Sequence, residues 1–173
     1  MQDISQSDII LGVKEVPIKD LMPHKKYFFF SHTIKKQAHN RKLLQAILQK
    51  NITLIDYETL VDDHGGRLIA FGKYAGIVGA HNGLWTYGQR TGLFDWPRLK
   101  DLHDFEQART IYHQTTLPPV KIVLTGSGRV AYGAISALKD MNIQEVSPLE
   151  FLKQEDFETA VFTHLTSADY VKH

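Results

Sequence analysis

Short, uninterrupted runs of apolar residues are the feature that most constrains what this chain can fold into. The first two runs, Ile9–Val13 and Tyr27–Phe30, are four or five residues long, and each stops at polar residues. Runs of this length that are bounded by charge, glycine or proline are typical of buried strands in a parallel sheet. Three further runs follow, at Thr53–Tyr57, Arg67–Phe71 and Val120–Thr125. The sequence therefore predicts an α/β fold with parallel sheets flanked by helices.

Helical patterns separate these runs. Four leucine and isoleucine residues between positions 43 and 48 share one helical face, and Asn51 marks the expected end of that helix. Residues 97–113 are also expected to be helical, as is the tail, 148–173, which contains a short apolar piece at 160–162. Residues 72–92 are rich in glycine and alanine. Because glycine is costly in a helix, this density predicts either a helix packed very close to another backbone or a loop.

Composition excludes several classes of protein. The 173 residues carry a net charge of +1, which gives no electrostatic reason to expect nucleic acid or an anionic membrane as a partner. No apolar run approaches the roughly 20 residues of a membrane span, and the first residues lack the pattern of a signal peptide. The absence of cysteine excludes a disulfide scaffold, a thiol nucleophile and a zinc–thiolate site. The nine histidines show no metal-binding spacing, so we expect no metal, and a cytoplasmic protein in a reducing compartment.

Ionisable side chains stand where the first apolar runs end. Lys14 and Glu15 follow the first run, His32 follows the second, and Glu58 closes the third. The carboxyl ends of parallel strands line the crevice where open α/β sheets bind ligands, so these groups are expected to share one rim. Histidine titrates near neutrality, and burial or a cationic neighbour brings a lysine towards it, so the set is suited to proton transfer. Solvated charges and a structural histidine are the alternatives, and the other eight histidines are taken as surface or structural residues.

A glycine-rich turn, Gly126-x-Gly128-x-x-Ala131, stands between an apolar run and a helical segment. This is the context of a dinucleotide-binding fingerprint. The first glycine allows the turn, the second lets a pyrophosphate approach the backbone, and the alanine lets the helix pack on the strand. The helix N-terminus favours the anion. The residues expected at the pyrophosphate are Gly126, Ser127, Gly128, Arg129 and Val130. A purely structural α/β turn is the alternative.

The residue that would bind the adenosine ribose is not acidic. An aspartate or glutamate is expected about 20 residues after the turn, at the end of the second strand, and Ser147 stands near that position. Glu145 or Glu150 would serve only in a different register. A neutral residue removes the repulsion against a 2′-phosphate, so the expected cofactor is NAD or NADP. Arg129 is a candidate for binding that phosphate and is equally well explained as a surface residue.

The order of these motifs resembles that of one enzyme family. The segments ILGVKEVP, FFFSHTIKKQ, LIDYE, GGRLIAFGKYAGIVGA and VLTGSGRVAYGA follow one another along the chain. In these segments the chain is similar to the lysine-forming saccharopine dehydrogenases and to the lysine-ketoglutarate reductase half of the bifunctional lysine-degrading enzyme. It resembles alanine dehydrogenases and the NAD-binding subunit of proton-translocating transhydrogenase more distantly. The FSHTIK and AFGKYAG stretches favour the saccharopine branch.

The resemblance implies two Rossmann-like domains with a cleft between them and a pyridine-nucleotide reaction. Lysine and 2-oxoglutarate would condense to an imine that hydride reduces to saccharopine, or the reverse would occur. The family pattern implies that Lys14 and His32 form the acid–base pair. Glu15 and Glu58 would tune that pair electrostatically. The substrate-binding candidates are Arg67, which would grip a carboxylate, and Lys35.

The resemblance also implies a domain organisation. Residues 1–96 would form most of a catalytic domain, 97–118 a connecting helix and linker, and 119–173 the first part of a Rossmann nucleotide-binding domain. The family chain is longer, so its first strands, with a substrate-binding arginine, are expected before Met1, and further nucleotide-domain strands after His173. The expected partner is a small-molecule substrate, and a homo-oligomer is also considered. Rival functions are an alanine dehydrogenase, a transhydrogenase subunit or a catalytically silent nucleotide-binding or assembly module.

Overall fold

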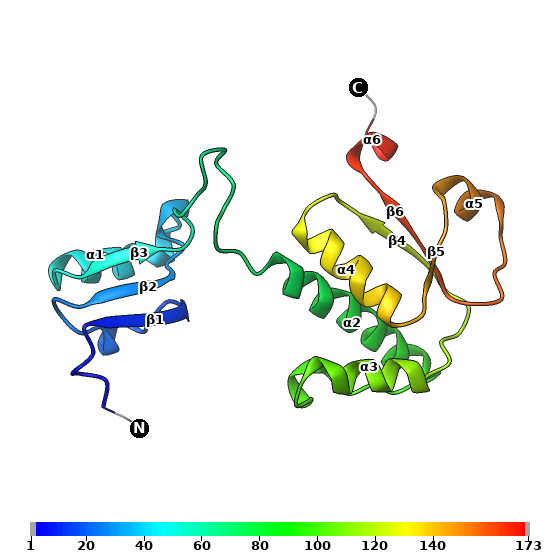
Figure 1. The fold of residues 1–173 in the computed structure, drawn as a ribbon, viewed down its shortest axis with the longest axis horizontal. Helices are drawn as coiled ribbons and strands as arrows, with labels where there is room; N and C mark the ends of the chain where they lie inside the picture. The colour runs from blue at the N-terminus through cyan, green and yellow to red at the C-terminus, as the bar shows by residue number, and fades with distance from the viewer. Residues whose placement is uncertain (1–2, 172–173) are drawn as a thin grey trace. The chain divides into compact units, whose positions relative to one another are not determined.

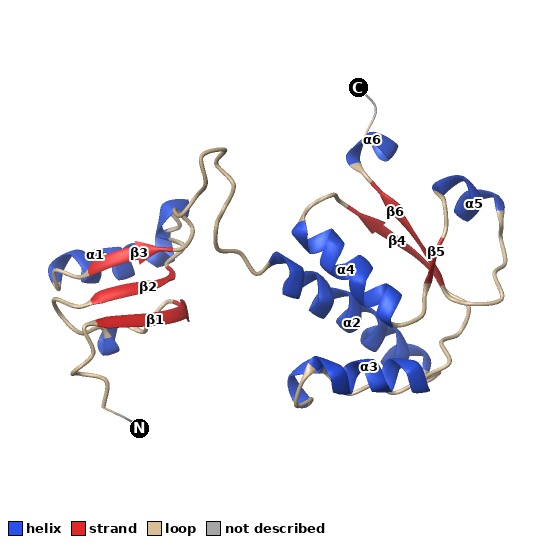
Figure 2. Ribbon diagram, viewed as in Figure 1, coloured by secondary structure: helices blue, strands red, loops and turns tan. Residues whose placement is uncertain are grey.

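The computed structural model describes residues 3–171, and the chain divides into two compact units, Met1–Ala70 and Phe71–His173 (Figure 1). Each unit has its own small parallel sheet and its own helices (Figure 2). The division falls earlier than the connector predicted at 97–118. The reason is that helix α2 (Gly72–Thr91) packs against helix α4 (Arg129–Asp140), which belongs to the second unit.

The first unit is a sheet of three parallel strands in the order β1-β2-β3. Its elements are β1 (Ile9–Lys14), η1 (Ile18–Asp20), β2 (Lys26–Phe30), η2 (Thr33–Lys35), η3 (Ala38–Asn40), α1 (Arg41–Gln49) and β3 (Thr53–Asp56). Leu43 and Ile47 of α1 form one core cluster with Tyr27 and Phe29 of β2. The helical spacing of the leucine and isoleucine residues thus places one face of α1 on the sheet.

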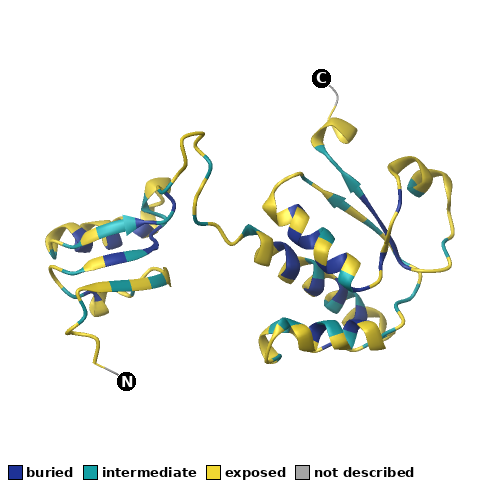
Figure 3. Ribbon diagram, viewed as in Figure 1, coloured by how far each residue is buried: buried dark blue, intermediate teal, exposed yellow. Residues whose placement is uncertain are grey.

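The apolar runs of the first unit differ in how well they are covered (Figure 3). Tyr27 and Phe29 of the central strand β2 are almost completely buried, as a run without alternation predicts. In β1, by contrast, Leu11 is 71% exposed, and Ile9 and Val13 are 52% and 53% exposed. β1 lies at an edge of the sheet and pairs only with β2. The run therefore predicted the strand correctly but not its full burial, because burial depends on neighbouring elements and not on the strand itself.

The second unit also contains a parallel sheet, in the order β4-β6-β5. Its elements are α2 (Gly72–Thr91), η4 (Leu99–Asp101), α3 (Phe105–Gln114), β4 (Lys121–Thr125), α4 (Arg129–Asp140), β5 (Gln144–Glu145), α5 (Pro148–Lys153), β6 (Val161–Leu165) and α6 (Ser167–Tyr170). The prediction of a helical tail is wrong at β6, which is the central strand of this sheet. Its apolar piece is too short for periodicity to separate a strand from a helix, and the full burial of Phe162 comes from tertiary packing.

Two predicted elements differ in extent. Residues 67–71 do not form a strand. Arg67 makes only an isolated antiparallel bridge with Val61, and Leu68 is 63% exposed, because no further strand lies alongside this segment in the described part of the first unit. The helix predicted from Pro97 begins instead at Phe105, where the side chain of Asp104 accepts a hydrogen bond from the backbone N–H of Gln107 at 2.9 Å. Asp104 is therefore the N-cap that sets this helix start.

The glycine-rich segment forms helix α2, and its close approach to another backbone is confirmed. A Cβ atom added at Gly76 would lie 1.9 Å from the carbonyl oxygen of Val130 in α4. A Cβ atom added at Gly133 of α4 would lie 2.0 Å from the carbonyl oxygen of Lys73 in α2. The two helices therefore cross backbone against backbone, at positions where no side chain fits.

His81 is a structural histidine in the core of the second unit, where its side chain is stacked on Trp96. Its Nδ1 lies 2.7 Å from the Tyr112 hydroxyl and its Nε2 lies 3.0 Å from the Pro97 carbonyl oxygen. Because that carbonyl can only accept, Nε2 carries the proton and the Tyr112 hydroxyl donates to Nδ1. Burial lowers the pKa of His81, since desolvation disfavours the charged ring. This histidine therefore fixes the packing of α2 against α3 and is kept neutral.

The helix crossing makes a paired prediction for stability. Gly76→Ala should lower the free energy of unfolding by about 1 to 3 kcal/mol, because the new methyl group forces the helices apart. Gly79→Ala is the matched control, since a Cβ atom there meets nothing within 4 Å. It should raise stability by roughly 0.5 to 1 kcal/mol through helix propensity. Urea unfolding of both variants measures the difference, and equal effects of the two substitutions would contradict the proposed crossing.

Candidate functional site

The strands of the first unit end at one edge of their sheet. In the parallel register Lys14 pairs with Phe30, and Phe29 pairs with Asp56. The residues that directly follow β1, β2 and β3 therefore emerge from neighbouring strand ends, where open α/β sheets bind ligands. Lys14 itself is the last residue of β1 and is exposed.

His32 and Glu15 are brought together at this edge. The Nδ1 atom of His32 lies 3.5 Å from Oε2 of Glu15, and the two side chains are 26% and 45% exposed. The imidazole stacks on the ring of Phe30, with a centroid distance of 6.5 Å. The backbone of His32 is left-handed, with φ 56° and ψ 7°, which costs a residue with a Cβ atom about 1 to 2 kcal/mol. A partly exposed imidazole that a carboxylate orients is suited to accepting and donating protons.

Glu58 forms the second cluster at this edge. Its side chain is only 2% exposed, and its Oε1 atom lies 3.4 Å from Nζ of Lys35 and 3.3 Å from a guanidinium nitrogen of Arg67. These two cations are themselves about half exposed. Its other oxygen, Oε2, is buried and has no hydrogen-bond partner within residues 3–171. Two cations held by one buried carboxylate can present positive charge to an anionic ligand, and the unpaired oxygen can accept a proton donor.

Sequence reasoning missed two further polar residues of this edge, Ser31 and Asp56. Both are buried, with exposures of 0% and 7%. The Ser31 hydroxyl makes a very short hydrogen bond to Oδ2 of Asp56. Oδ1 of Asp56 accepts from the backbone N–H of Glu58 at 2.9 Å. The available signal was the position of each residue along the chain. Ser31 lies between the end of β2 and His32, and Asp56 is the last residue of β3, two residues before Glu58.

The glycine-rich turn of the second unit has the geometry expected for binding a pyrophosphate. Gly126 has φ +106°, a conformation that L side chains rarely adopt, so the turn needs glycine here. Gly128 is the N-cap of α4 and makes no side-chain cap, and a Cβ atom added to it meets nothing within 4 Å. The N-terminus of this 12-residue helix is thus open towards an anion. Ser127 lies in the same turn, and Arg129 and Val130 are the first, exposed residues of the helix.

Ser147 does not stand beside this turn in the way the sequence suggested. It follows β5, and β6 lies between β5 and β4 in the sheet. Its hydroxyl accepts a hydrogen bond from the backbone N–H of Glu150 at 3.2 Å and so caps α5. The strand next to β4 is β6, whose His164 places Nε2 2.5 Å from the carbonyl oxygen of Gly126. Strand order, which a single sequence does not give, decides which residue borders the turn.

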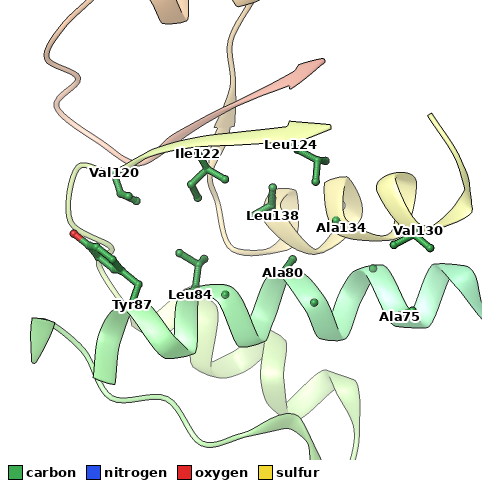
Figure 4. A pocket seen from close by; sticks show the side chains of 13 residues that line it. Ala75, Ala80, Leu84, Tyr87, Val120, Ile122, Leu124, Val130, Ala134 and Leu138 are labelled. Carbon is green, nitrogen blue, oxygen red and sulfur yellow. The ribbon is translucent and has the colours of Figure 1, made fainter. Parts of the chain in front are cut away.

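An apolar hollow of about 450 Å³ lies between α2, α4 and β4 (Figure 4). Its lining comes from Leu84 and small residues of α2, from Ile122 and Leu124 of β4, and from Ala134 and Leu138 of α4. Tyr87 is the only lining residue with an ionisable side chain, so the hollow lacks the carboxylate, lysine and imidazole groups found at the strand ends of the first unit. Residues 3–171 contain no cluster of potential metal ligands and no helix long and apolar enough to cross a membrane.

Comparison with known proteins finds sequence relatives of this chain. Residues 1–78 match the family described as alanine dehydrogenase/PNT, N-terminal domain. The chain is 37% identical over 167 residues to the mitochondrial alpha-aminoadipic semialdehyde synthase of Bos taurus, covering 86% of this chain and 18% of that protein. It is 33% identical over 174 residues to the saccharopine dehydrogenase (NAD⁺, L-lysine-forming) of Candida glabrata, covering 93% of this chain and 46% of that protein. The chain thus spans about half the length of this dehydrogenase and under a fifth of the synthase.

A solved structure of an L-alanine dehydrogenase supports the fold. It matches with a TM-score of 0.51 at 14% identity, over 95% of this chain and 44% of that one. The solved structure therefore shows an α/β fold shared with this chain, and residues 1–78 match the model of the alanine dehydrogenase/PNT N-terminal domain. In sequence the chain is similar to saccharopine dehydrogenases and alpha-aminoadipic semialdehyde synthases.

The left-handed backbone of His32 predicts that this residue lowers the stability of the protein. His32→Gly should raise the free energy of unfolding by about 1 kcal/mol, because glycine adopts this conformation without strain. The control is Ile34→Gly, at an exposed position of η2, which should lower stability by roughly 0.5 to 1 kcal/mol. Chemical denaturation of the two variants measures the effect. A loss of stability in His32→Gly equal to that in Ile34→Gly would show that His32 is not strained.

Proposed function

We propose that the protein is a pyridine-nucleotide-dependent oxidoreductase that acts on the CH–NH bond of an amino acid, interconverting saccharopine with lysine and 2-oxoglutarate. The observation that carries the proposal is the pair of clusters at the carboxyl edge of the first sheet, Glu15 with His32 and Glu58 with Lys35 and Arg67. The relatives named saccharopine dehydrogenase support the choice of substrate. They favour it over alanine or a transhydrogenase role, because the saccharopine dehydrogenase and the alpha-aminoadipic semialdehyde synthase compared above are 33% and 37% identical to the chain, whereas the solved L-alanine dehydrogenase is 14% identical.

Acid–base chemistry is assigned to His32 and Lys14. Forming or hydrolysing an imine requires one group that takes a proton from the attacking amine or water and one that delivers a proton to the leaving oxygen or nitrogen. His32 is partly exposed and oriented by Glu15, so its imidazole can do either. Lys14 ends the neighbouring strand, from which its ammonium can act as the partner acid.

Substrate binding is assigned to Arg67 and Lys35. Saccharopine and 2-oxoglutarate carry carboxylates, which a guanidinium binds best through two parallel hydrogen bonds. Glu58 contacts both cations through a single oxygen. This holds the two side chains in place but neutralises only part of their positive charge, so they can still bind a substrate carboxylate.

The cofactor is assigned to the turn of the second unit. The φ of Gly126, the open space in front of Gly128 and the uncapped N-terminus of α4 fit a pyrophosphate, which the backbone of residues 126–130 would hold. When bound, NAD or NADP supplies or accepts the hydride. No residue of this turn distinguishes NAD from NADP, because the Ser147 side chain caps α5.

Removing the acid–base residues tests the reaction. In the protein that carries these residues, Lys14→Met and His32→Gln should each lower turnover by roughly 100- to 10,000-fold and each remove one limb of a bell-shaped pH–rate profile. Arg67→Ala should instead raise the Michaelis constant for the oxo acid or saccharopine by about 10- to 100-fold, with a smaller effect on turnover. The measurement is steady-state oxidation of reduced nicotinamide nucleotide with lysine and 2-oxoglutarate.

Matched variants away from the edge control this experiment. Lys26→Met lies at the start of β2, His64→Gln in an exposed turn, and Arg90→Ala on α2, and all three should leave the kinetics unchanged. Wild-type protein that does not turn over with either cofactor would overturn the proposal and favour a silent nucleotide-binding module. Unaltered turnover in both Lys14→Met and His32→Gln would make these residues structural.

Cofactor binding is tested by Gly128→Asp. Aspartate is a good N-cap and finds open space here, so the substitution should leave the stability of α4 unchanged or slightly higher. The added carboxylate repels a pyrophosphate, and the Kd for NADH and NADPH should rise by at least about tenfold. Gly128→Ser caps without charge and is the control. Equal nucleotide affinity in wild type and Gly128→Asp, measured by calorimetry, would place the pyrophosphate elsewhere.

A further inference from the structure

We infer that Asp56 is a positioning residue, whose buried carboxylate sets the placement of both His32 and Glu58 through hydrogen bonds. The inference rests on the proposed function for its link to turnover, but its geometry stands on its own. Asp56 ends β3 next to the end of β2, and its side chain lies between the two strand ends. It is 7% exposed, so it acts through neighbouring residues and not on a substrate.

The Asp56 carboxylate reaches His32 through Ser31. Oδ2 accepts a hydrogen bond from the Ser31 hydroxyl, and Oδ1 accepts from the Ser31 backbone N–H at 3.4 Å. The Ser31 oxygen in turn accepts from the Thr33 backbone N–H at 3.1 Å and lies 2.7 Å from the Thr33 hydroxyl. The residues on both sides of His32 are thus tied to one carboxylate. This network explains how a histidine is kept in the left-handed conformation that places its ring beside Glu15.

The same carboxylate reaches Glu58 directly. Oδ1 of Asp56 accepts from the Glu58 backbone N–H at 2.9 Å, and the Asp56 backbone carbonyl accepts from Thr59. The turn after β3 is therefore closed on Asp56 itself. Because Glu58 holds Lys35 and Arg67, the same carboxylate that fixes the histidine also fixes the two cations.

A purely structural role for Asp56 predicts different results for its variants. An aspartate that only closes a turn would affect stability alone. Asp62 is such a residue in the same unit, since its Oδ1 accepts from the backbone N–H groups of His64 and Gly66 at 2.9 and 2.7 Å. Asp62→Ala is therefore the matched control for Asp56→Ala.

The experiment compares four variants by the ¹⁵N and ¹³C signals of the His32 imidazole, assigned by their loss in His32→Gln. Asp56→Ala and Ser31→Ala should shift these signals, and Asp62→Ala should not. Asp56→Asn keeps an acceptor for both backbone N–H groups, and its amide can donate to the Ser31 oxygen while the Ser31 hydroxyl donates to Thr33 instead, so it should resemble the wild type. That conservative rescue separates hydrogen-bond geometry from charge.

Kinetics then separate the two arms. Ser31→Ala removes only the arm to His32 and should lower turnover by about 10- to 100-fold with little change in the Michaelis constant for the oxo acid. Asp56→Ala removes both arms and should lower turnover and raise that constant together. If Asp56→Ala does not fold, Ser31→Ala and Asp56→Asn still carry the test.

The outcomes are distinct. Unchanged His32 signals in folded Asp56→Ala and Ser31→Ala, or equal shifts in Asp62→Ala, overturn the positioning role whatever the activity. Asp56→Asn that behaves like Asp56→Ala overturns the geometric account. Shifted His32 signals in a protein whose wild type does not turn over saccharopine leave Asp56 as the positioning residue and refute the proposed reaction instead.

Discussion

The parallel pairing of β2 with both β1 and β3 is the constraint on which the candidate site depends. Parallel strands run in one direction, so their carboxyl ends meet at one edge, and the register sets which residues are level with each other. β2 is buried because α1 covers it, which anchors the other two strands by their hydrogen bonds. Every ionisable residue of the edge is attached to one of these strand ends or to the turns that follow them.

Two features of the site lower the stability of the folded state but hold side chains in position. His32 adopts a left-handed backbone, and Glu58 buries a carboxylate with one oxygen unpaired within residues 3–171. Both features are unfavourable in isolation. They persist because surrounding groups hold them, namely the hydrogen bonds of Asp56 and Ser31 and the two cations beside Glu58. Left-handed φ values also occur at His24, Lys36 and Asn51 of this unit, so backbone strain alone does not mark the edge, and the buried carboxylate with an unpaired oxygen is the more specific feature.

The second unit depends on a different contact, the backbone approach of α2 and α4 at Gly76 and Gly133. This crossing assigns α2 to the second unit, and the compact units divide between Ala70 and Phe71, before α2. It also leaves the turn at Gly126 at the head of α4, where the backbone amides are available to an anion. A small-residue helix thus serves packing, while the glycines of the turn serve conformation and access.

The sequence by itself determined the strand-forming runs β1 to β4, the helices α1 and α4, and the set of chemically capable residues, while it left α2 open as a helix or a loop. Each follows from a local property: run length, helical spacing, or the φ that only glycine adopts readily. Only the tertiary structure decided the burial of β1, the loss of a strand at residues 67–71, the identity of β6 as a central strand and its position between β4 and β5. It also decided the roles of Ser31, Asp56 and Ser147. Strand order, cover and hydrogen-bond partners join residues far apart in the chain, and local patterns carry no information about which distant groups meet.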